Sequence, residues 1–427
     1  MKHLASCLAL LAALLLSFAA QAQGVTIGAA GPPAASAVLE LKSTTQGVLF
    51  PRLTASQREA ITAPVLGLLV FQTDYTVGVY YYSGTAWLNL ANNLETGRFS
   101  PAVSSLAGNG TQAFADGQGA TARFYSPLGV ACDGSGNVFV ADAVNNRIRR
   151  IVAATGVVST LAGSGTYGFA DGPGGTAQFA RPTGVACDAS GNVYVADSDN
   201  QRIRKIVAAT GAVSTLAGNA SYGFADGTGA AARFFNPSGV ACDAGGTVYV
   251  ADQDNQRIRR IVAATGAVST LAGSTYGFAD GPGATALFNG PAGVACDASG
   301  NVFVADYYNN RIRRIVAATG MVSTLAGSGA YGFADGPGAA AQFANPSGVA
   351  CDASGNVFVA DQSNHCIRAV VAATGAVSTL AGSGTAGFAD GPGISTQFNN
   401  PQGVACDASG TVYVADTNNQ RIRVLKR

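Results

Sequence analysis

The residues with the clearest potential for metal chemistry are grouped in one short segment of the chain. His365 and Cys366 are adjacent, and Asp361 lies a few residues before them. Imidazole, thiolate and carboxylate are all zinc ligands, but a closed zinc site takes four of them. The only other histidine is His3, so no second imidazole is available nearby. We interpret the cluster as the divergence of one sequence repeat, and we predict no metal and no cofactor.

Six of the eight cysteines recur in one motif, Gly-Val-Ala-Cys-Asp, at intervals of 54 or 55 residues: Cys132, Cys187, Cys242, Cys296, Cys351 and Cys406. Each motif leads to an Asn-Val-Phe/Tyr-Val-Ala-Asp run or its Thr-Val variant. Arg-Ile-Arg and Val-Ser-Thr-Leu-Ala-Gly follow in most copies. These are short β-branched runs separated by Asp-Ala-Ser-Gly and Ala-Ala-Thr-Gly turns. Four strands at a period of about 40–55 residues are typical of a β-propeller blade.

The two ends of the repeat array complement each other. Residues 103–108 read as a fourth strand without a blade before it, and the last unit stops after its third strand at residues 421–425. Pairing these two strands would remove two exposed sheet edges. We predict an all-β fold: a six-bladed β-propeller of four-stranded blades, closed by the N-terminal strand and preceded by a small β-rich segment.

This fold gives structural roles to the repeated polar groups. Equivalent cysteines of different blades lie farther apart than the roughly 7 Å that a disulfide can bridge between Cα atoms, so we predict buried thiols. The following aspartate, such as Asp188, is expected to cap its own turn, although six of them could instead form a calcium ring. The Phe-Ala-Asp-Gly loops, as at residues 169–172, are expected to pack on the next blade. Asp142 is expected to pair with Arg147 across its hairpin, as at the equivalent positions of most blades.

Composition excludes some partners. The chain of 427 residues has a net charge of +1, with 11% charged and 48% apolar residues. Nucleic-acid binding depends on lysine and arginine that neutralise phosphates, so we predict no nucleic-acid partner. No segment after the N-terminal leader is long and apolar enough to span a bilayer.

The segment Asn-Val-Tyr-Val-Ala-Asp-Ser-Asp-Asn-Gln-Arg-Ile-Arg-Lys-Ile at residues 192–206 resembles an NHL repeat, as do its five counterparts. The resemblance covers the region from about residue 100 onward. NHL propellers include enzymes, protein and RNA binders and extracellular modules. The amidating lyase among them uses histidine-bound zinc, and related lactonases hold a channel metal partly through glutamate. The chain has only His365 beyond its leader and no glutamate after Glu95, so we predict no enzymatic activity.

The repeats differ most at two positions on one face, the top face. One is the hairpin tip between the second and third strands of each blade, and the other precedes the proline that opens the first strand. Scaffold positions are fixed by packing, whereas loops on one face are free to carry recognition, although neutral drift would give the same variation. The candidate ligand-binding residues are Tyr307, Tyr308, Arg181, Phe235, Tyr125, Asn345, Asn400 and His365.

The first 99 residues divide into two parts. Residues 1–22 have a basic start, an apolar run and an Ala-Gln-Ala site, which are typical of a signal peptide. A lipobox-like Leu-Ala-Ser-Cys around Cys7 is the weaker alternative. Residues 23–99 are expected to form a β-rich, stalk-like segment with a helical patch at residues 56–61. This segment resembles N-terminal parts of secreted Bacteroidetes adhesins and tail fibres, and the propeller is expected over residues 100–427.

Two hypotheses of function follow. The first is an exported, non-catalytic binding module whose top-face loops recognise a protein or glycan in the cell envelope or outside the cell. The second is a structural or adhesive surface protein, with the propeller as a head on the N-terminal stalk. A channel-metal hydrolase or lyase is the weakest alternative, and the oligomeric state is not determined by the sequence.

Overall fold

The computed structural model describes residues 25–28, 39–42, 50–65, 68–74, 77–82, 87–89 and 101–426. The predicted signal peptide, residues 1–22, and the lipobox-like segment around Cys7 lie outside these ranges. Among the helices described, none has the length and apolar character needed to cross a membrane.

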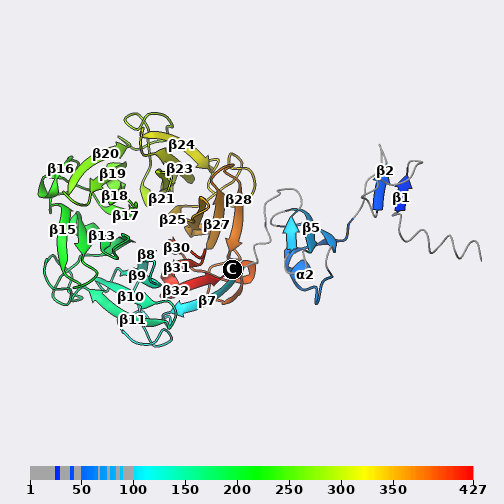
Figure 1. The fold of residues 1–427 in the computed structure, drawn as a ribbon, viewed down its shortest axis with the longest axis horizontal. Coiled ribbons are helices and arrows are strands. Elements are labelled where there is room, and N and C mark those ends of the chain that lie inside the picture. Colours follow the sequence, from blue (N-terminus) through cyan, green and yellow to red (C-terminus); the bar gives the residue numbers. More distant parts are fainter. Residues whose placement is uncertain are drawn as a thin grey trace, which may run out of the picture.

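Residues 101–426 are folded into sheets arranged around a common centre (Figure 1). We number the six sheets of this region along the chain. Sheet 1 contains β8 (Pro127–Cys132), β9 (Asn137–Asp142), β10 (Arg147–Val152) and β11 (Val157–Ala162). Sheet 2 contains β12 (Pro182–Cys187), β13 (Val193–Asp197), β14 (Arg202–Ile206) and β15 (Val213–Gly218). Sheet 3 contains β17 (Pro237–Cys242), β18 (Thr247–Asp252), β19 (Arg257–Val262) and β20 (Ala267–Ala272), with β16 (Gly227–Thr228) at its edge.

The remaining sheets repeat this order. Sheet 4 contains β21 (Pro291–Cys296), β22 (Asn301–Asp306), β23 (Arg311–Val316) and β24 (Met321–Ala326). Sheet 5 contains β25 (Pro346–Cys351), β26 (Asn356–Asp361), β27 (Cys366–Val371) and β28 (Val377–Ala381). Sheet 6 contains β30 (Pro401–Cys406), β31 (Val412–Asp416) and β32 (Arg421–Lys426), together with β7 (Ala102–Ala107) and β29 (Gly391–Pro392). Short 3-10 turns follow the second strand of sheets 2–6: η2 (Ser198–Asn200), η4 (Gln253–Asn255), η5 (Tyr307–Asn309), η6 (Gln362–Asn364) and η8 (Thr417–Asn419). Two further turns, η3 (Gly229–Ala231) and η7 (Gly393–Ser395), lie in loops between sheets.

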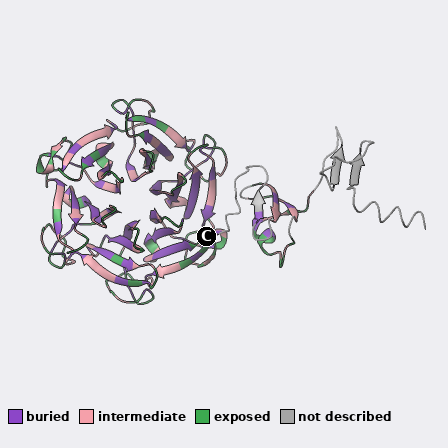
Figure 2. Ribbon diagram, in the orientation of Figure 1, coloured by how far each residue is buried: buried purple, intermediate pink, exposed green. Residues whose placement is uncertain are grey.

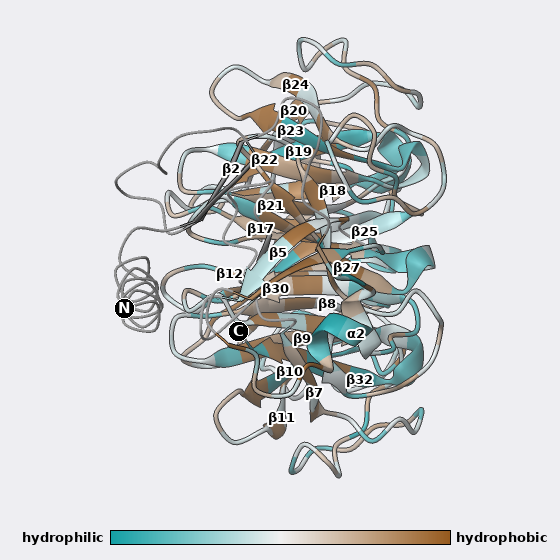
Figure 3. Ribbon diagram, turned by 90° about the vertical axis from the view of Figure 1, so that its right-hand side faces the viewer, coloured by the Kyte–Doolittle hydropathy of each residue, from teal (hydrophilic) through white to brown (hydrophobic). Residues whose placement is uncertain are grey.

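The strands begin and end where the local chemistry requires. The Asp188 carboxylate accepts hydrogen bonds from the backbone N–H groups of Ser190 and Asn192, at 3.0 and 2.9 Å, and so closes the turn after β12. This confirms the capping role predicted for that aspartate. The following strand, β13, is buried along its whole length, as expected for a strand covered on both faces. In the side view, strands are coloured mainly as hydrophobic and several connecting segments as hydrophilic (Figure 3).

The hydrophobic core lies between neighbouring sheets. Ile203 and Tyr194 of sheet 2 pack with Phe234, Val240 and Val250 at sheet 3, and the other sheet pairs have equivalent clusters. The buried residues accordingly follow the strands around the whole ring (Figure 2). Apolar burial contributes about 25 cal/mol per Å², so each interface between sheets stabilises both of its members.

Glycine allows the innermost strands to approach one another. A methyl group on Gly184 of β12 would overlap the carbonyl oxygen of Ser238 in β17, and a methyl group on Gly403 of β30 would overlap that of Leu128 in β8. The equivalent glycines 129, 239, 293 and 348 face the next strand in the same way. The innermost strands contact one another in the order β8, β12, β17, β21, β25, β30 and again β8.

Strand β7 supplies the missing outer strand of sheet 6. It pairs antiparallel with β32, with Ala107 opposite Ile422 and Val103 opposite Leu425. Both Val103 and Ala107 are buried. The predicted pairing of the first strand of this region with the last is therefore confirmed.

The described part of the N-terminal region is also β-rich. It contains β1 (Val25–Gly28) paired with β2 (Leu39–Lys42), and a sheet of β3 (Arg52–Leu53), β4 (Leu69–Gln72), β5 (Gly78–Tyr82) and β6 (Trp87–Asn89). Helix α2 (Ala55–Glu59) begins one residue before the predicted patch and ends two residues before its end. A reciprocal capping box between Thr54 and Gln57 fixes its start.

Candidate functional site

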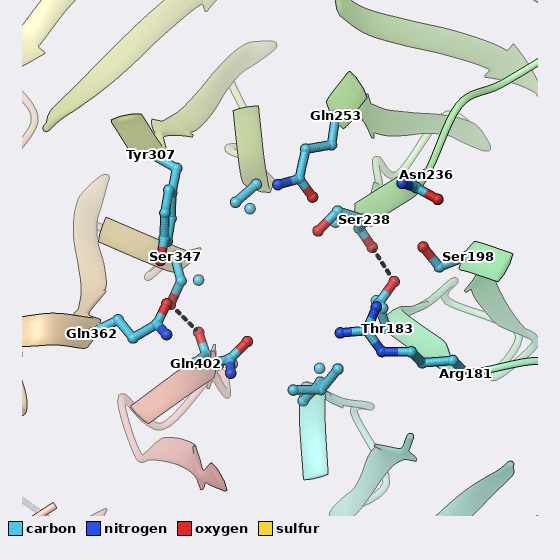
Figure 4. Close-up of a pocket in the computed structure, with 18 of the residues that line it drawn as sticks. Arg181, Thr183, Ser198, Asn236, Ser238, Gln253, Tyr307, Ser347, Gln362 and Gln402 are labelled. Carbon is cyan, nitrogen blue, oxygen red and sulfur yellow. Dashed lines mark hydrogen bonds between the residues drawn. The ribbon is translucent and has the colours of Figure 1, made fainter. Parts of the chain in front are cut away.

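A cavity of about 360 Å³ opens where the innermost strands begin (Figure 4). This side of the ring is the top face of the sequence analysis, and from here on we call it the pocket face. Its walls come from the first residues of the innermost strands and from the turns that follow the second strands. Apart from glycines, the lining residues are Leu128, Arg181, Thr183, Ser198, Asn236, Ser238, Gln253, Asp254, Ala292, Tyr307, Tyr308, Ser347, Gln362 and Gln402.

Most of this lining is neutral and capable of hydrogen bonding. Arg181 and Asp254 are the charged members among the residues that the structure places there. Thr183 donates to the Ser238 carbonyl at 3.1 Å, and Ser347 donates to the Gln402 carbonyl at 3.0 Å (Figure 4). These two hydroxyls therefore link neighbouring innermost strands as well as lining the pocket.

A buried aspartate at the end of each second strand fixes the geometry of the pocket. Asp197 of sheet 2 accepts from the Ala180 N–H at 2.8 Å, just before β12, and from Asn200 of η2 at 2.9 Å. It also accepts from Arg204 at 2.6 Å. One carboxylate thus holds both wall segments, the turn and the start of the innermost strand.

The prediction that each of these aspartates pairs with the arginine opposite it in the hairpin is wrong. The backbone register is as expected, with Asp197 opposite Arg202, and Asp142 opposite Arg147 in sheet 1. The ion pair, however, joins Asp197 to the fully buried Arg204, two residues farther along, and Asp142 to Arg149. The strand is irregular at this point, and the long arginine side chain reaches back across the register.

Arg204 also binds the loop that precedes its sheet. Its guanidinium contacts Asp171 of the Phe-Ala-Asp-Gly loop at 2.6 Å, and Phe169 of the same loop lies against it with the ring centroid at 4.8 Å. The predicted packing of this loop on the following sheet is therefore confirmed. Arg202 instead lies over the Phe169 ring, at 3.9 Å, and donates to the carbonyl of Asn200.

A second set of hydrogen bonds joins each sheet to the next around the pocket. The residue that ends each turn accepts from the N–H of the residue before the next innermost strand. Examples are Gln201 with Asn236 at 2.7 Å, and Gln420 with Ser126 at 2.6 Å, which connects sheet 6 to sheet 1. The residues before the proline have positive φ, at Ser126, Arg181, Asn236, Gly290, Asn345 and Asn400. Their backbones therefore serve the fold, and the side chains of Arg181 and Asn236 line the pocket.

His365 takes part in this set of links. Its Nδ1 accepts from the N–H of Asn400 at 3.2 Å, in the position that glutamine occupies in sheets 2, 3 and 6. Burial lowers the pKa of His365 below its ordinary value, and the nearby charge of Asp416 opposes this shift. The geometry therefore uses the neutral imidazole as an acceptor between sheets 5 and 6.

The protonation of His365 predicts a pH effect on stability. Because the folded-state pKa is lowered, the unfolded chain takes up the proton at a higher pH than the folded protein. The neutral His365 side chain makes its full contribution to the free energy of unfolding above about pH 6.5, and this contribution is lost as the pH falls through the folded-state pKa. We expect the melting temperature of the wild type to fall by roughly 1–2 °C more than that of His365→Gln between pH 8 and pH 5, a small change because the side chain is half-exposed. Parallel pH profiles for the two proteins would contradict this.

The repeat cysteines lie at the ends of the innermost strands away from the pocket, and they are half-buried instead of buried as predicted, whereas the buried Cys366 begins β27. Cys132, Cys187, Cys242, Cys296 and Cys351, together with Cys366, are free thiols. Burial, reinforced by the charges of Asp133 and Asp188, raises the pKa of Cys187 to about 12, and its thiol donates to the carbonyl of Cys132. Across the ranges that the structure describes, no three His, Cys, Asp or Glu side chains are grouped so as to hold a metal ion.

The predicted ligand-binding residues divide into two groups. Tyr307, Tyr308 and Arg181 line the pocket. Phe235, Tyr125, Asn345, Asn400 and His365 lie on the same face but are not among the lining residues. The Tyr307 and Tyr308 rings meet edge to face, with their centroids 4.8 Å apart. Tyr307 is half-buried and Tyr308 is exposed.

Sequence reasoning missed several lining residues. The second residue of each Pro-x-Gly start faces the pocket: Leu128, Thr183, Ser238, Ala292, Ser347 and Gln402. This position varies within a motif that is otherwise constant, and that variation was the available signal. Gln253 and Gln362 lie at the variable hairpin tips between the second and third strands.

Comparison with known proteins identifies the repeats. The NHL repeat model matches residues 179–206, 288–315, 343–369 and 398–425, which hold the first three strands of sheets 2, 4, 5 and 6. The chain contains NHL repeats. Residues 26–107 match a phage tail like trimerisation region, in line with the predicted resemblance to tail-fibre modules.

The curated relatives that this chain matches are longer than the chain itself. It is 33% identical to Protein SUPPRESSOR OF QUENCHING 1, chloroplastic, from Arabidopsis thaliana over 62% of this chain and 27% of that protein. It is 30% identical to NHL repeat-containing protein 2 from Bos taurus over 68% of this chain and 45% of that protein. The chain thus spans less than half the length of these relatives.

The fold also occurs among solved structures. An auxiliary nutrient binding protein from Bacteroides thetaiotaomicron superposes with a TM-score of 0.59 at 16% identity, over 81% of this chain and 85% of that one. At this identity the similarity shows a shared propeller-like fold.

Proposed function

We propose that this NHL-repeat protein is an exported, non-catalytic binding module that recognises a protein or glycan through its pocket face. The observation that carries the proposal is the open cavity of about 360 Å³ with a mainly neutral, polar and aromatic lining. Binding sites typically combine apolar or aromatic surface with a few placed hydrogen-bonding groups. Tyr307 and Tyr308 supply the aromatic surface, and Gln253, Gln362 and Gln402 supply amides.

The scaffold of this module is proposed to be a closed six-bladed β-propeller over residues 100–427. Three features support closure: the circular contacts of the innermost strands, the glycine approach of β30 to β8, and the Gln420–Ser126 hydrogen bond between sheets 6 and 1. Strand β7 completes sheet 6. A closed ring holds the pocket walls in fixed positions, so binding requires little ordering of the protein.

The non-catalytic part of the proposal rests on the residues at hand. His365 is the only histidine among the described residues, and its Nδ1 already accepts a hydrogen bond from the N–H of Asn400. General acid–base and nucleophilic catalysis would need a titratable group in hydrogen-bond reach of a substrate. The titratable side chains of the pocket are Arg181, Asp254, Tyr307 and Tyr308. Asp254 is engaged by Asn236 at 2.5 Å, and burial raises the pKa of Tyr307 further from neutrality. Export is supported by the leader-like residues 1–22, and the shared fold with a nutrient-binding protein is compatible with a binding role.

The double variant Tyr307→Ser/Tyr308→Asn tests the proposal. Serine and asparagine stand at equivalent tips, at Ser198 and Asn418, so the fold should persist with an unchanged melting temperature. We expect binding to arrayed glycans and envelope proteins to weaken by about tenfold or more, as for a modest hot spot. Ser299→Ala and Thr319→Ala, on the opposite face, are the controls. Undiminished binding by the double variant, with loss in the controls, would refute the assignment of the face.

A second candidate function is favoured by the N-terminal region. Residues 26–107 match a trimerisation region, which suggests an adhesive protein with three propeller heads on a common stalk. Three linked heads would raise the avidity for a repetitive surface without any new contact. Light scattering on the protein without residues 1–22 distinguishes the two candidate functions. A trimeric stalk gives roughly three times the monomer mass, whereas a single binding module gives the mass of the monomer.

A further inference from the structure

Four tyrosines on the pocket face are largely exposed, at a position where the fold also accepts other residues. We propose that Tyr167, Tyr222, Tyr276 and Tyr331, here called the tyrosine arc, extend the pocket into a binding site for a neutral oligosaccharide chain. One end of the chain would lie in the pocket, and further sugar rings would lie against the tyrosines. This inference rests on the proposed binding function of the pocket and names its ligand class.

The tyrosine arc lies directly outside the pocket walls. Each tyrosine precedes a glycine whose carbonyl accepts a hydrogen bond from an asparagine of the neighbouring turn. Asn200 of η2 donates to Gly168 at 2.8 Å, and Asn309 of η5 donates to Gly277 at 2.7 Å. The same turns carry the lining residues Ser198, Gln253, Tyr307 and Gln362. The loops that carry the arc are therefore bonded to the turns that line the pocket in sheets 2 to 5.

The tyrosine side chains are exposed although their backbone is held in place. Their exposed fractions are 62%, 70%, 77% and 64% in chain order. Bridges join Tyr167 to Phe179 and Tyr276 to Phe288, which fixes the backbone of these loops. A large ring displayed on a fixed backbone can bind a ligand at a low entropic cost.

The fold itself does not require tyrosine at this position. The equivalent residues in the loops before sheets 1 and 6 are Gln112 and Ala386, and those loops keep the same contacts. Asn145 donates to Ala113 at 3.0 Å and Asn419 donates to Gly387 at 2.7 Å, as in the other sheets. Tyrosine is therefore not needed to hold these loops in place.

Contacts connect the arc to the pocket rim. The Tyr222 and Phe235 rings lie 5.2 Å apart, and the Tyr167 hydroxyl donates to Asp199 of η2 at 3.3 Å. Tyr331 lies close enough to Tyr307 for its charge to help raise the pKa of that phenol, after burial and Tyr308. Three of the four arc tyrosines thus lie next to residues at or beside the pocket wall.

The chemistry of this surface matches a sugar better than a protein. A pyranose ring has flat C–H faces, which pack on aromatic rings, and many hydroxyls, which suit amide and hydroxyl groups such as those of Gln253, Gln362 and Ser238. Protein interfaces instead bury an apolar centre. The exposed large aliphatic side chains Val157, Val262, Val316 and Met321 lie at the opposite ends of the strands. On the pocket face of the described region, Val144 is the exposed exception.

The test compares short and long neutral oligomers of glucose, mannose and galactose by calorimetry on the protein without residues 1–22. We expect affinity to rise with oligomer length. The variant Tyr222→Ala/Tyr276→Gln, which copies the residues at 386 and 112, should lose about tenfold in affinity for long oligomers and leave short ones unchanged. Gln112→Ala is the matched control and should change nothing. Equal melting temperatures will show that each variant is folded.

Failure of this inference is separable from failure of the proposed function. If Tyr307→Ser/Tyr308→Asn abolishes binding of any glycan or protein while the arc variant binds as well as the wild type, the pocket stands and the arc is overturned. Lack of binding to every neutral oligomer, or loss of an envelope protein instead of a sugar in the arc variant, also overturns it. If neither variant affects any binding, the pocket assignment fails as well.

Discussion

Replacing Arg204 by alanine is expected to lower the free energy of unfolding by about 3–5 kcal/mol, because it leaves a buried carboxylate without its cation. Asp197 is fully buried and pairs with Arg204 at 2.6 Å. The same change also removes the contact with Asp171, which anchors the loop before sheet 2. The measurement is the denaturation midpoint in urea, followed by circular dichroism.

The matched control is Arg202→Ala on the same strand. Arg202 faces Asp197 in the register but makes its contacts with the Phe169 ring and the carbonyl of Asn200. Its loss should cost about 1 kcal/mol or less, since it leaves no buried charge unpaired. If Arg202→Ala destabilises as much as Arg204→Ala, the assignment of the ion pair is incorrect.

The difference between the two arginines shows where sequence reasoning reaches its limit. The repeat places an aspartate and two arginines at fixed spacing, which is enough to predict the hairpin and its register. It does not show which guanidinium turns inward, because Asp171 lies 33 residues before Arg204 and enters only through the fold. A side chain with partners from three segments cannot be assigned from the hairpin alone.

The strands and their pairing were predictable for a simpler reason. Six copies of one pattern place β-branched runs and Asp–Gly turns at the same positions, so each copy supports the prediction made from the others. The strand boundaries at Pro182–Cys187 and Val193–Asp197 follow the motif directly. The pairing of β7 with β32 followed from the incomplete units at the two ends.

The sequence was enough to predict which face of the propeller carries the pocket, but not most of the residues that line it. Variable hairpin tips pointed to Tyr307 and Tyr308, which line it. His365 and Asn400 vary as well, yet they are joined to each other as a link between sheets. Sequence variation marks positions that tolerate different side chains. A position that needs only a hydrogen-bond acceptor also varies, because glutamine, asparagine and histidine can each supply one. The arc tyrosines repeat in only four units, so comparison of the repeats could have distinguished them.

Deleting residues 100–108 is expected to have the other large effect. It removes β7, and with it the backbone pairing to β32 and the burial of Val103 and Ala107. The cluster between sheets 5 and 6 would lose Val103 beside Leu425 and Phe398. Strand β32 would become an exposed edge able to pair with another chain.

We expect the melting temperature to fall by about 10 °C or more, or the protein to aggregate, since the lost strand costs several kcal/mol and each kcal/mol is worth about 2–4 °C in a domain of about 150–250 residues. The control is deletion of residues 23–99, which leaves β7 in place and should leave the sheets stable. Calorimetry and light scattering on both variants give the answer. Strand β7 is the N-terminal strand of this region and β32 is the C-terminal one. A large fall in melting temperature on deletion of residues 100–108, but not on deletion of residues 23–99, therefore means that pairing of the two ends holds the ring together. An unchanged melting temperature without β7 would mean that sheet 6 is stable with three strands and that the ring does not depend on this closure.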